Sequence, residues 1–416
     1  MAAQGSLSRS RAVALDAGDP LAWTRDRFAW DAGEVVYLDG NSLGRPPRAA
    51  LEAVAAAGLQ WQERLVRGWD DWIERPRGVG DLLAETVLGA GEGQVLVCDS
   101  VTVNLFKLAA AAIHGRPGAI VCSADEFPTD RYVLAGLGRE LRELRAASSE
   151  TPTADEVARA CAGGDVAVVC LSHVAYRSGG RADAPAITAA ARAAGAIVLW
   201  DLSHSAGSVP VSLDAWGAEL AVGCTYKYLC GGPGAPAFLY VRRDLQDRLR
   251  SPIQGWFGQR DQFAMGPAYE PAAGIERFAA GTPPILALAA IEPAIRLIAE
   301  AGMDAIAARS ARLTDYAIEL FDGWLEPIGM ELATPRAADR RGAHVALRHP
   351  EAWRLCRALI ERSRVVPDFR TPDIVRVGLA PLTTRFSDVW DGLAALRELL
   401  ATGAYREVDA APRRVT

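Results

Sequence analysis

The chain contains 416 residues, of which 50% are hydrophobic and 23% are charged, and its formal net charge is −6. A chain of this length is expected to form two domains. Its basic residues are scattered, which offers nucleic acid no basic surface, and its longest apolar runs, such as residues 285–291, are too short to cross a bilayer. We therefore expect neither a nucleic-acid partner nor a membrane span.

The cysteines and the N-terminus favour a cytoplasmic protein. The seven cysteines form no CxxC pair, and several lie in apolar, strand-like runs, so we expect buried, reduced thiols. The opening residues, MAAQGSLSRSRAVAL, lack the apolar core and cleavage site of a secretory signal. They indicate a disordered leader. The five histidines are too dispersed to indicate a metal site.

Before residue 90 the pattern predicts a short strand and two helices. The segment VVYLDGNSLGRPP, residues 35–47, reads as a strand that runs into a turn. A helical pattern follows over residues 47–67, and the segment containing Trp69 and Trp72 is predicted to be a loop. A second helix is expected over residues 81–88.

From residue 95 to residue 241 apolar strands alternate with helices. Helices are predicted over residues 104–113, 153–162 and 184–194, and a further one follows the turn at residues 127–130 and runs to about residue 137. Continuous apolar strands separated by helices are typical of a mostly parallel sheet covered on both faces. The sequence thus predicts an α/β domain with seven strands, over residues 95–97, 119–123, 141–145, 166–171, 196–200, 220–224 and 237–241.

After residue 285 the pattern changes to that of a smaller α+β domain. One long helix is expected over residues 285–301 and bridges the two domains, and another is expected over residues 304–325. Two or three strands and two further helices, over residues 351–362 and 387–400, complete the chain. We divide the chain into an N-terminal segment packing on the small domain, a large domain and a small C-terminal domain, at residues 1–48, 49–285 and 286–416.

Lys227 is conspicuous because it is one of only two lysines among 45 basic residues, the other being Lys107. Where a plain positive charge suffices, this chain uses arginine. A retained lysine therefore favours chemistry that a guanidinium cannot perform, namely losing a proton near neutral pH and forming an imine with a carbonyl. The alternative is an ordinary solvated lysine.

Polar groups follow several predicted strands, at the edge where ligands bind to a parallel sheet. Ser100, Val101 and Thr102 follow one strand and precede a helix that starts near residue 103. Free N–H groups and a hydroxyl at a helix N-terminus suit a phosphate, although a simple helix cap is equally compatible. Phe127 follows the next strand. Two interpretations are open for it: a core residue, or an aromatic platform on which a cofactor ring stacks. Asp201 directly follows an apolar strand and requires a cationic partner if it is buried, and His204 lies three residues further.

A phosphate site, a ring platform, a buried carboxylate and an imine-forming lysine, in this order, form the set that pyridoxal 5'-phosphate (PLP) requires. The carboxylate keeps the pyridine nitrogen protonated, and the lysine holds the cofactor and moves protons. Each signal is unspecific alone, and it is the order and spacing that indicate a PLP enzyme.

At these residues the sequence resembles the kynureninase family, within the aspartate-aminotransferase superfamily of fold-type I PLP enzymes (a PLP-dependent transferase-like fold). The resemblance covers nearly the whole chain. Its segments are YLDGNSLGRPP, VTVNLFKL, FPTD, WDLSHSAGSVPV, TYKYLCGGPGAPAFLYV, GWFGQ and RFAAGTPPI. Asp201 and Lys227 are common to the fold type, whereas DGNSLG, FPTD and GWFG are specific to the family.

The resemblance implies a role for each matching residue. Lys227 would be the Schiff-base lysine, Asp201 the partner of the pyridine nitrogen and Arg376 the clamp of the substrate carboxylate. Cofactor contacts are implied for Val101, Thr102, Phe127, Asp130, Ser172, Asp201, His204, Tyr226, Lys227, Trp256 and Thr282. The family supplies Trp256 and Thr282 across a homodimer interface, and Trp69, Gly281 and Thr282 match the aryl pocket.

The implied reaction is hydrolytic Cβ–Cγ cleavage of L-kynurenine to anthranilate and L-alanine in tryptophan catabolism, with 3-hydroxykynurenine as a poorer substrate. Lys227, Tyr226 and Asp201 are the implied catalytic residues, with Tyr226 as candidate proton donor. One alternative is a cysteine desulfurase or selenocysteine lyase, which needs a mobile cysteine; Cys356 alone lies in the small-domain region, within a helical pattern. The other is a non-catalytic PLP-binding protein.

Overall fold

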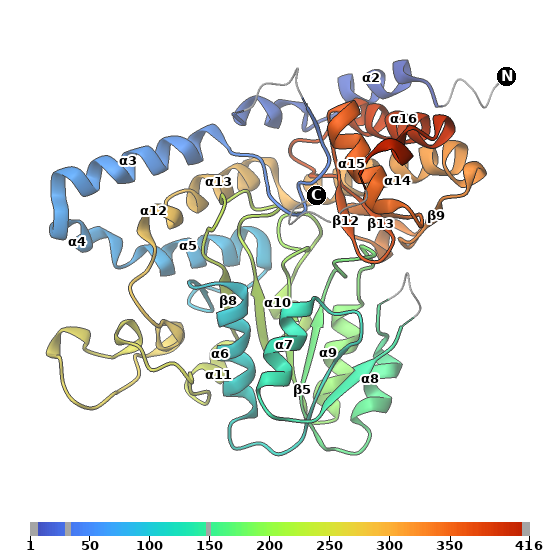
Figure 1. The fold of residues 1–416 in the computed structure, drawn as a ribbon. Coiled ribbons are helices and arrows are strands. Elements are labelled where there is room, and N and C mark those ends of the chain that lie inside the picture. Colours follow the sequence, from blue (N-terminus) through green and yellow to red (C-terminus); the bar gives the residue numbers. More distant parts are fainter. Residues whose placement is uncertain (1–6, 30–34, 147–150, 410–416) are drawn as a thin grey trace.

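A seven-stranded sheet forms the centre of the large domain in the computed structural model, which describes residues 7–29, 35–146 and 151–409 (Figure 1). The strand order is β2-β8-β7-β6-β5-β3-β4, and only β8 runs antiparallel to its neighbours. The predicted mostly parallel α/β sheet is confirmed. Its strands are β2 (Val95–Val97), β3 (Ala119–Ser123), β4 (Leu141–Leu144), β5 (Val166–Ser172), β6 (Ile197–Asp201), β7 (Leu220–Gly223) and β8 (Phe238–Val241).

Helices cover both faces of this sheet because the strands are apolar on both sides. In β5, Val169 and Leu171 face one core, whereas Val168 and Cys170 face the other, as the two-residue period of a strand dictates. The first core is closed by α5 (Arg75–Leu83), α8 (Ala154–Cys161), α9 (Ala184–Ala193), α10 (Leu213–Trp216) and α13 (Ile291–Ala301). The second is closed by α6 (Val101–Ile113), α7 (Pro128–Gly136) and α11 (Arg243–Gln246).

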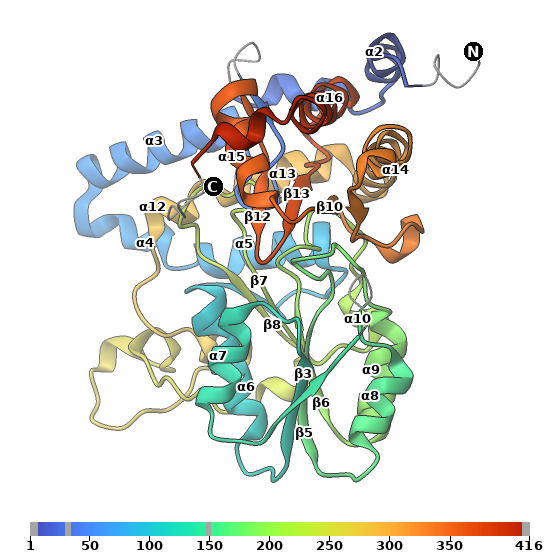
Figure 2. The same ribbon diagram turned by 45° about the vertical axis from the view of Figure 1, so that its right-hand side comes forward.

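The C-terminal part forms a second core around an antiparallel sheet, seen from another side in Figure 2. Its strand order is β12-β13-β10-β9. The strands are β9 (Glu331–Leu332), β10 (His344–Arg348), β12 (Asp368–Arg370) and β13 (Ile374–Gly378), and the helices are α14 (Met303–Trp324), α15 (Ala352–Ser363) and α16 (Phe386–Thr402). The division of the chain at residue 285 remains a prediction.

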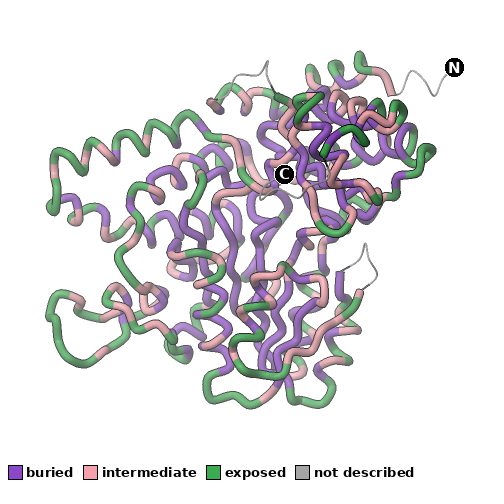
Figure 3. Tube along the Cα trace, in the orientation of Figure 1, coloured by how far each residue is buried: buried purple, intermediate pink, exposed green. Residues whose placement is uncertain are grey.

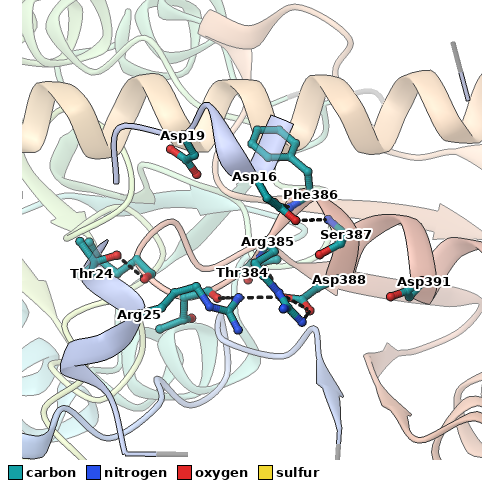
Figure 4. A network of polar contacts seen from close by, with 12 residues as sticks. Asp16, Asp19, Thr24, Arg25, Thr384, Arg385, Phe386, Ser387, Asp388 and Asp391 are labelled. Atoms are coloured by element: carbon teal, nitrogen blue, oxygen red, sulfur yellow. Dashed lines mark hydrogen bonds and ion pairs between the residues drawn. The ribbon is translucent and has the colours of Figure 1, made fainter. Parts of the chain in front are cut away.

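The N-terminal segment lies against this C-terminal part. Its α2 (Arg9–Ala17) runs beside α16, and the strand β1 (Val36–Tyr37) pairs in parallel with β11 (Val365–Val366). The carboxylate of Asp16 accepts hydrogen bonds from the backbone N–H groups of Phe386 and Ser387, which open α16 (Figure 4). A further helical turn, η1 (Ala22–Arg27), contributes Arg25, which pairs with Asp388.

Two predicted elements differ from the structure. The segment predicted to be a loop is helical: α3 (Arg48–Arg64) continues through η2 (Leu65–Gly68) into α4 (Trp69–Trp72), and α5 begins at Arg75. The long helix predicted over residues 285–301 is broken into α12 (Ile285–Leu288) and α13. Pro293 causes this break, because its ring collides with the carbonyl four residues earlier, at Ala289.

Exposed segments extend to one side of the large domain (Figure 3). They are α3 and the chain from residue 256 to residue 284, hereafter the arm, which contains η4 (Trp256–Gly258), η5 (Gln262–Ala264) and η6 (Gly274–Phe278). Among the described residues no helix is long and apolar enough to cross a membrane. The remaining short turns are η3 (Ala84–Leu88), η7 (Glu326–Ile328), η8 (Ala338–Arg340) and η9 (Ala404–Glu407).

Candidate active site

A cavity of about 320 Å³ lies at the carboxyl ends of the parallel strands. The chain reverses direction after each of these strands, so residues far apart in the sequence meet at this edge. Nine residues that the sequence predicts as cofactor contacts line the cavity: Val101, Thr102, Phe127, Asp130, Ser172, Asp201, His204, Tyr226 and Lys227.

Lys227 extends into this cavity from the turn that follows β7. Its Nζ lies 2.9 Å from Nε2 of His204. Burial lowers the pKa of His204 well below its ordinary value, and the nearby charges of Lys227 and Arg376 lower it further. The imidazole is therefore neutral, and Nε2 can accept a hydrogen bond from the lysine.

The carboxyl groups of Asp130 and Asp201 form another wall of the cavity, hereafter the carboxyl wall. Oδ1 of Asp201 accepts a hydrogen bond from the backbone N–H of Ser203 at 2.7 Å. Burial, together with the charges of Asp201 and Glu126, raises the pKa of Asp130 well above its ordinary value. Oδ2 of Asp130 is buried and has no hydrogen-bond partner. Two buried carboxyl groups that interact this strongly suit a cationic N–H donor as a ligand.

The N-terminus of α6 provides the anion-binding end of the cavity. Ser100 caps the helix, since its hydroxyl accepts from the backbone N–H of Val103. The N–H groups of Val101 and Thr102 belong to the first turn, where they have no partner within the helix. Both residues line the cavity together with Tyr226, and burial raises the pKa of the Tyr226 phenol, which stays protonated. A phosphate dianion fits this end.

Phe127 stands at the mouth of the cavity, where it precedes α7. Its side chain is 40% exposed, and its ring meets that of Tyr176 edge-on at 5.3 Å. The exposure excludes the alternative that Phe127 is an ordinary core residue. Such a ring can stack on a planar ligand held between it and the carboxyl wall.

PLP fits this arrangement of residues. The unpartnered oxygen of Asp130 and the carboxylate of Asp201 would receive a protonated pyridine nitrogen or a ring substituent. The first turn of α6 would receive the phosphate, and Lys227 is the primary amine within reach. The four features lie in one cavity of the described chain.

Arg376 is buried behind this cavity, on β13 of the C-terminal part, and is 1% exposed. Nη1 donates to the carbonyl of Tyr176 at 2.6 Å, and Nη2 donates to the hydroxyl of Ser42 at 3.0 Å and to the carboxylate of Asp368. The Asn41 amide, with its oxygen toward the guanidinium, accepts from Nε at 2.7 Å. A substrate carboxylate would have to share this guanidinium with Asp368.

The remaining predicted contacts lie away from Lys227 within one chain. Gly281 and Thr282 line a second cavity of about 290 Å³, together with Phe257 of the arm. The ring of Phe257 lies 5.9 Å from that of Trp69 and 4.5 Å from that of Trp256. The structure thus groups the predicted aryl-pocket residues with each other, but not with the PLP cavity of the same chain.

The sequence did not identify four residues close to the site. Asn41 and Ser42 hold Arg376, and only their position in the DGNSLG segment signalled them. Glu126, directly before Phe127, accepts hydrogen bonds from the N–H and hydroxyl of Ser172. The ring of His344, on β10, packs edge-on against His204 at 5.3 Å, a contact that no sequence pattern could show.

Solved structures with this fold include PLP enzymes. The apo cysteine desulfurase from Thermococcus onnurineus NA1 superposes with a TM-score of 0.77, covering 88% of this chain and 95% of that chain at 19% identity. A C-DES variant with glycine covalently linked to its PLP cofactor also gives a TM-score of 0.77, covering 91% and 98% at 19% identity. These likenesses show that the chain has the fold of fold-type I PLP enzymes.

The family follows from closer relatives. A kynureninase of Burkholderia pseudomallei (strain 1106a) is 43% identical, covering 98% of this chain and 99% of that protein. A kynureninase of Pseudomonas fluorescens is 42% identical, covering 94% and 95%. The family model of the kynureninase C-terminal domain matches residues 306–396. The chain belongs to the kynureninase family of PLP-dependent hydrolases.

Proposed function

We propose that the chain hydrolyses the Cβ–Cγ bond of L-kynurenine, giving anthranilate and L-alanine, and that it prefers this substrate to 3-hydroxykynurenine. The proposal is carried by Lys227, whose Nζ lies 2.9 Å from Nε2 of a neutral His204. The same cavity is lined by the carboxyl wall and by the first turn of α6. When bound there, PLP supplies an aldehyde that reacts with amines and a ring that withdraws electrons from the reacting bonds.

Each lining residue has one task in this proposal. Lys227 holds the cofactor and, once displaced by the substrate amine, moves a proton at the substrate α-carbon. Asp201 keeps the pyridine nitrogen protonated, and Asp130 receives a polar edge of the ring. Phe127 stacks on the ring, Ser172 and His204 orient it, and the N–H groups of Val101 and Thr102 bind the phosphate.

Tyr226 is our candidate for the proton donor to the β-carbon after cleavage. Its phenol lines the cavity next to the first turn of α6, and its raised pKa keeps the proton on the oxygen at neutral pH. A phenol beside a phosphate can regain its proton from that group. Tyr226→Phe should therefore lower the rate of product release from the cofactor, with a smaller effect on substrate binding.

Arg376 is our candidate for binding the substrate carboxylate. Its guanidinium is fixed by Tyr176, Ser42 and Asp368, so it is held in place before the substrate arrives. A fixed planar fork binds a carboxylate with little loss of side-chain entropy. The neighbouring Asp368 would give up part of its contact when the substrate binds.

A homodimer completes the site in our proposal. The arm exposes Trp256, Phe263 and Met265, and α3 exposes Leu59 and Trp61. Exposed apolar side chains on segments that extend from the same side of a domain are typical of an interface. Trp256 and Thr282 of one subunit would then reach the cofactor of the other, and Trp69 and Gly281 would line its aryl pocket.

The cysteine desulfurase alternative has no support at the cysteines. All seven cysteines are buried, and we place the protein in the cytoplasm, where such thiols stay reduced. The thiol of Cys356 is fully buried and donates to the carbonyl of Asp368 at 3.4 Å. Burial raises its pKa well above the ordinary value, which makes it a poor nucleophile.

The test is turnover of L-kynurenine by the PLP-loaded protein, followed by anthranilate fluorescence, with L-cysteine and 3-hydroxykynurenine as comparison substrates. Lys227→Ala should abolish both turnover and the visible absorbance of the holoprotein. Arg376→Ala should raise KM by about 10-fold to 100-fold, because a charge-assisted hydrogen bond contributes about 1.5–3 kcal/mol. Faster release of sulfur from L-cysteine than of anthranilate from L-kynurenine would contradict the proposal, as would an unchanged KM in Arg376→Ala.

A further inference from the structure

The second lysine of the chain, Lys107, is fully buried in α6 and is 0% exposed. Its ammonium donates to three acceptors: Oδ2 of Asp99 at 2.6 Å, the carbonyl of Phe278 at 2.7 Å and Sγ of Cys98 at 3.4 Å. An ammonium has three N–H donors, so all of them are satisfied. A guanidinium is larger and has five donors, which explains why this position is a lysine in a chain that otherwise uses arginine.

Two of the three acceptors belong to the turn that precedes the phosphate-binding end of α6. Cys98 and Asp99 connect β2 to Ser100, the cap of that helix. Asp99 has a φ of +50°, a left-handed conformation that residues other than glycine adopt rarely. Because such a conformation persists only when its surroundings hold it, the ion pair with Lys107 fixes the turn that sets the direction of the first N–H groups of α6.

The third acceptor belongs to the arm. Phe278 is the last residue of η6, and residues 279–282 follow it along the wall of the second cavity. Asp99 lines both cavities, so it forms part of the wall between them. One ammonium therefore joins the phosphate end of the PLP cavity to the segment that leads to Gly281 and Thr282.

We propose that Lys107 is a positioning residue for PLP, which fixes the Asp99–Ser100 turn against the arm and so sets the affinity of the cavity for the cofactor phosphate. Lys107 does not touch the cofactor and acts through the backbone of the turn. The proposal rests on the assignment of the α6 N-terminus to the phosphate. It does not depend on which substrate the enzyme cleaves.

The test compares PLP affinity in three variants of the apoprotein, by titration of the cofactor absorbance. Lys107→Met keeps the length of the side chain and removes the ammonium, and we expect the Kd for PLP to rise at least about tenfold, the change that a loss of 1.4 kcal/mol gives. Asp99→Asn should also raise the Kd for PLP, and asparagine tolerates the left-handed conformation at this position. The double variant should be no weaker than Lys107→Met alone, because both changes remove one interaction.

A matched control is Gln246→Met. The buried Gln246 also bridges two segments of the large domain, donating to the carbonyls of Gly93 and Val241, but at the opposite end of the sheet. It should lower Tm and leave the Kd for PLP unchanged. A Kd for Lys107→Met within twofold of wild type, or one raised no more than in Gln246→Met, overturns the proposal. If Lys107→Met does not fold, an unchanged Kd in Asp99→Asn overturns it.

Discussion

Glu126 is a buried carboxyl group whose charge state affects the stability of the unliganded site. It is 5% exposed and accepts hydrogen bonds from the backbone N–H of Phe127 and from the N–H and hydroxyl of Ser172. Burial, and to a lesser extent the charge of Asp201, raises its pKa to about 7. Glu126 therefore connects two predicted cofactor contacts, Phe127 and Ser172. It gains or loses its proton near neutral pH.

The raised pKa predicts how apoprotein stability varies with pH. Below the ordinary glutamate pKa both folded and unfolded states carry the proton. Between that value and about 7 only the folded state keeps it, so stability falls as pH rises, by up to about 3 kcal/mol. Glu126→Gln, which mimics the protonated group, should gain in stability relative to wild type between pH 5 and pH 8. Urea unfolding of both apoproteins at the two pH values measures this, and a difference that stays constant with pH would rule out the assignment.

At the scale of an element, the turn over residues 39–44 connects the two halves of the site. Its Asn41 and Ser42 contact Arg376, and the N–H of Gly44 donates to the carbonyl of Tyr226 at 2.8 Å. A Cβ on Gly44 would lie 2.2 Å from the carbonyl oxygen of Lys227. Only glycine permits this approach, so the DGNSLG segment acts here through its backbone.

Gly44→Ala should therefore displace the backbone that carries Lys227. We expect kcat to fall by about 10-fold to 100-fold, since a displacement of about 1 Å at a reacting group has an effect of this size, with a loss of about 1–3 kcal/mol in stability. Steady-state kinetics and thermal unfolding measure the two effects. The control is Gly136→Ala, at an exposed position in α7 with no atom within 4 Å of the added Cβ. A variant Gly44→Ala with wild-type kcat would disprove the role of the turn.

Sequence patterns predicted the elements of the sheet better than the contacts between them. Apolar runs with turn residues at their ends located all seven strands, whereas the helix start after Val97 was left open between a cap and a phosphate site. The helical turn at Trp69–Trp72 was missed because its burial depends on distant partners such as Phe257. Two of the partners of Arg376 and Lys107, Ser42 and Phe278, could not be predicted because they come from segments far away in the sequence. Their other partners, Asp368, Asp99 and Cys98, lie within nine residues, but no pattern indicated those contacts.

At the scale of the whole molecule, our proposal joins the two groups of predicted site residues through a second subunit. Lys227 lines one cavity, whereas Thr282 lines the other and Trp256 belongs to the arm. A twofold-symmetric pair would contain two composite sites, each with Lys227 from one subunit and the arm from the other.

Mixing two inactive variants tests this arrangement. We expect Lys227→Ala and Trp256→Ala to be inactive or nearly so when each is alone. After they are unfolded together and refolded, hybrid dimers carry one intact site, so activity should return to about a quarter of wild type. Native mass spectrometry establishes whether hybrids have formed. Hybrids without activity would place Trp256 and Lys227 in the same subunit's site.

The scarcity of lysine gives this enzyme an unusual surface chemistry. Besides the N-terminal amine, the 416-residue chain carries two amino groups, and that of Lys107 is closed off by three acceptors. Lys227, which opens into the PLP cavity, is the remaining side-chain amine. Reactive aldehydes and sugars, which glycate surface lysines of other proteins, therefore meet no exposed lysine here. Reductive trapping with borohydride should label one side chain, and amine-directed cross-linkers should react elsewhere only at the N-terminal amine.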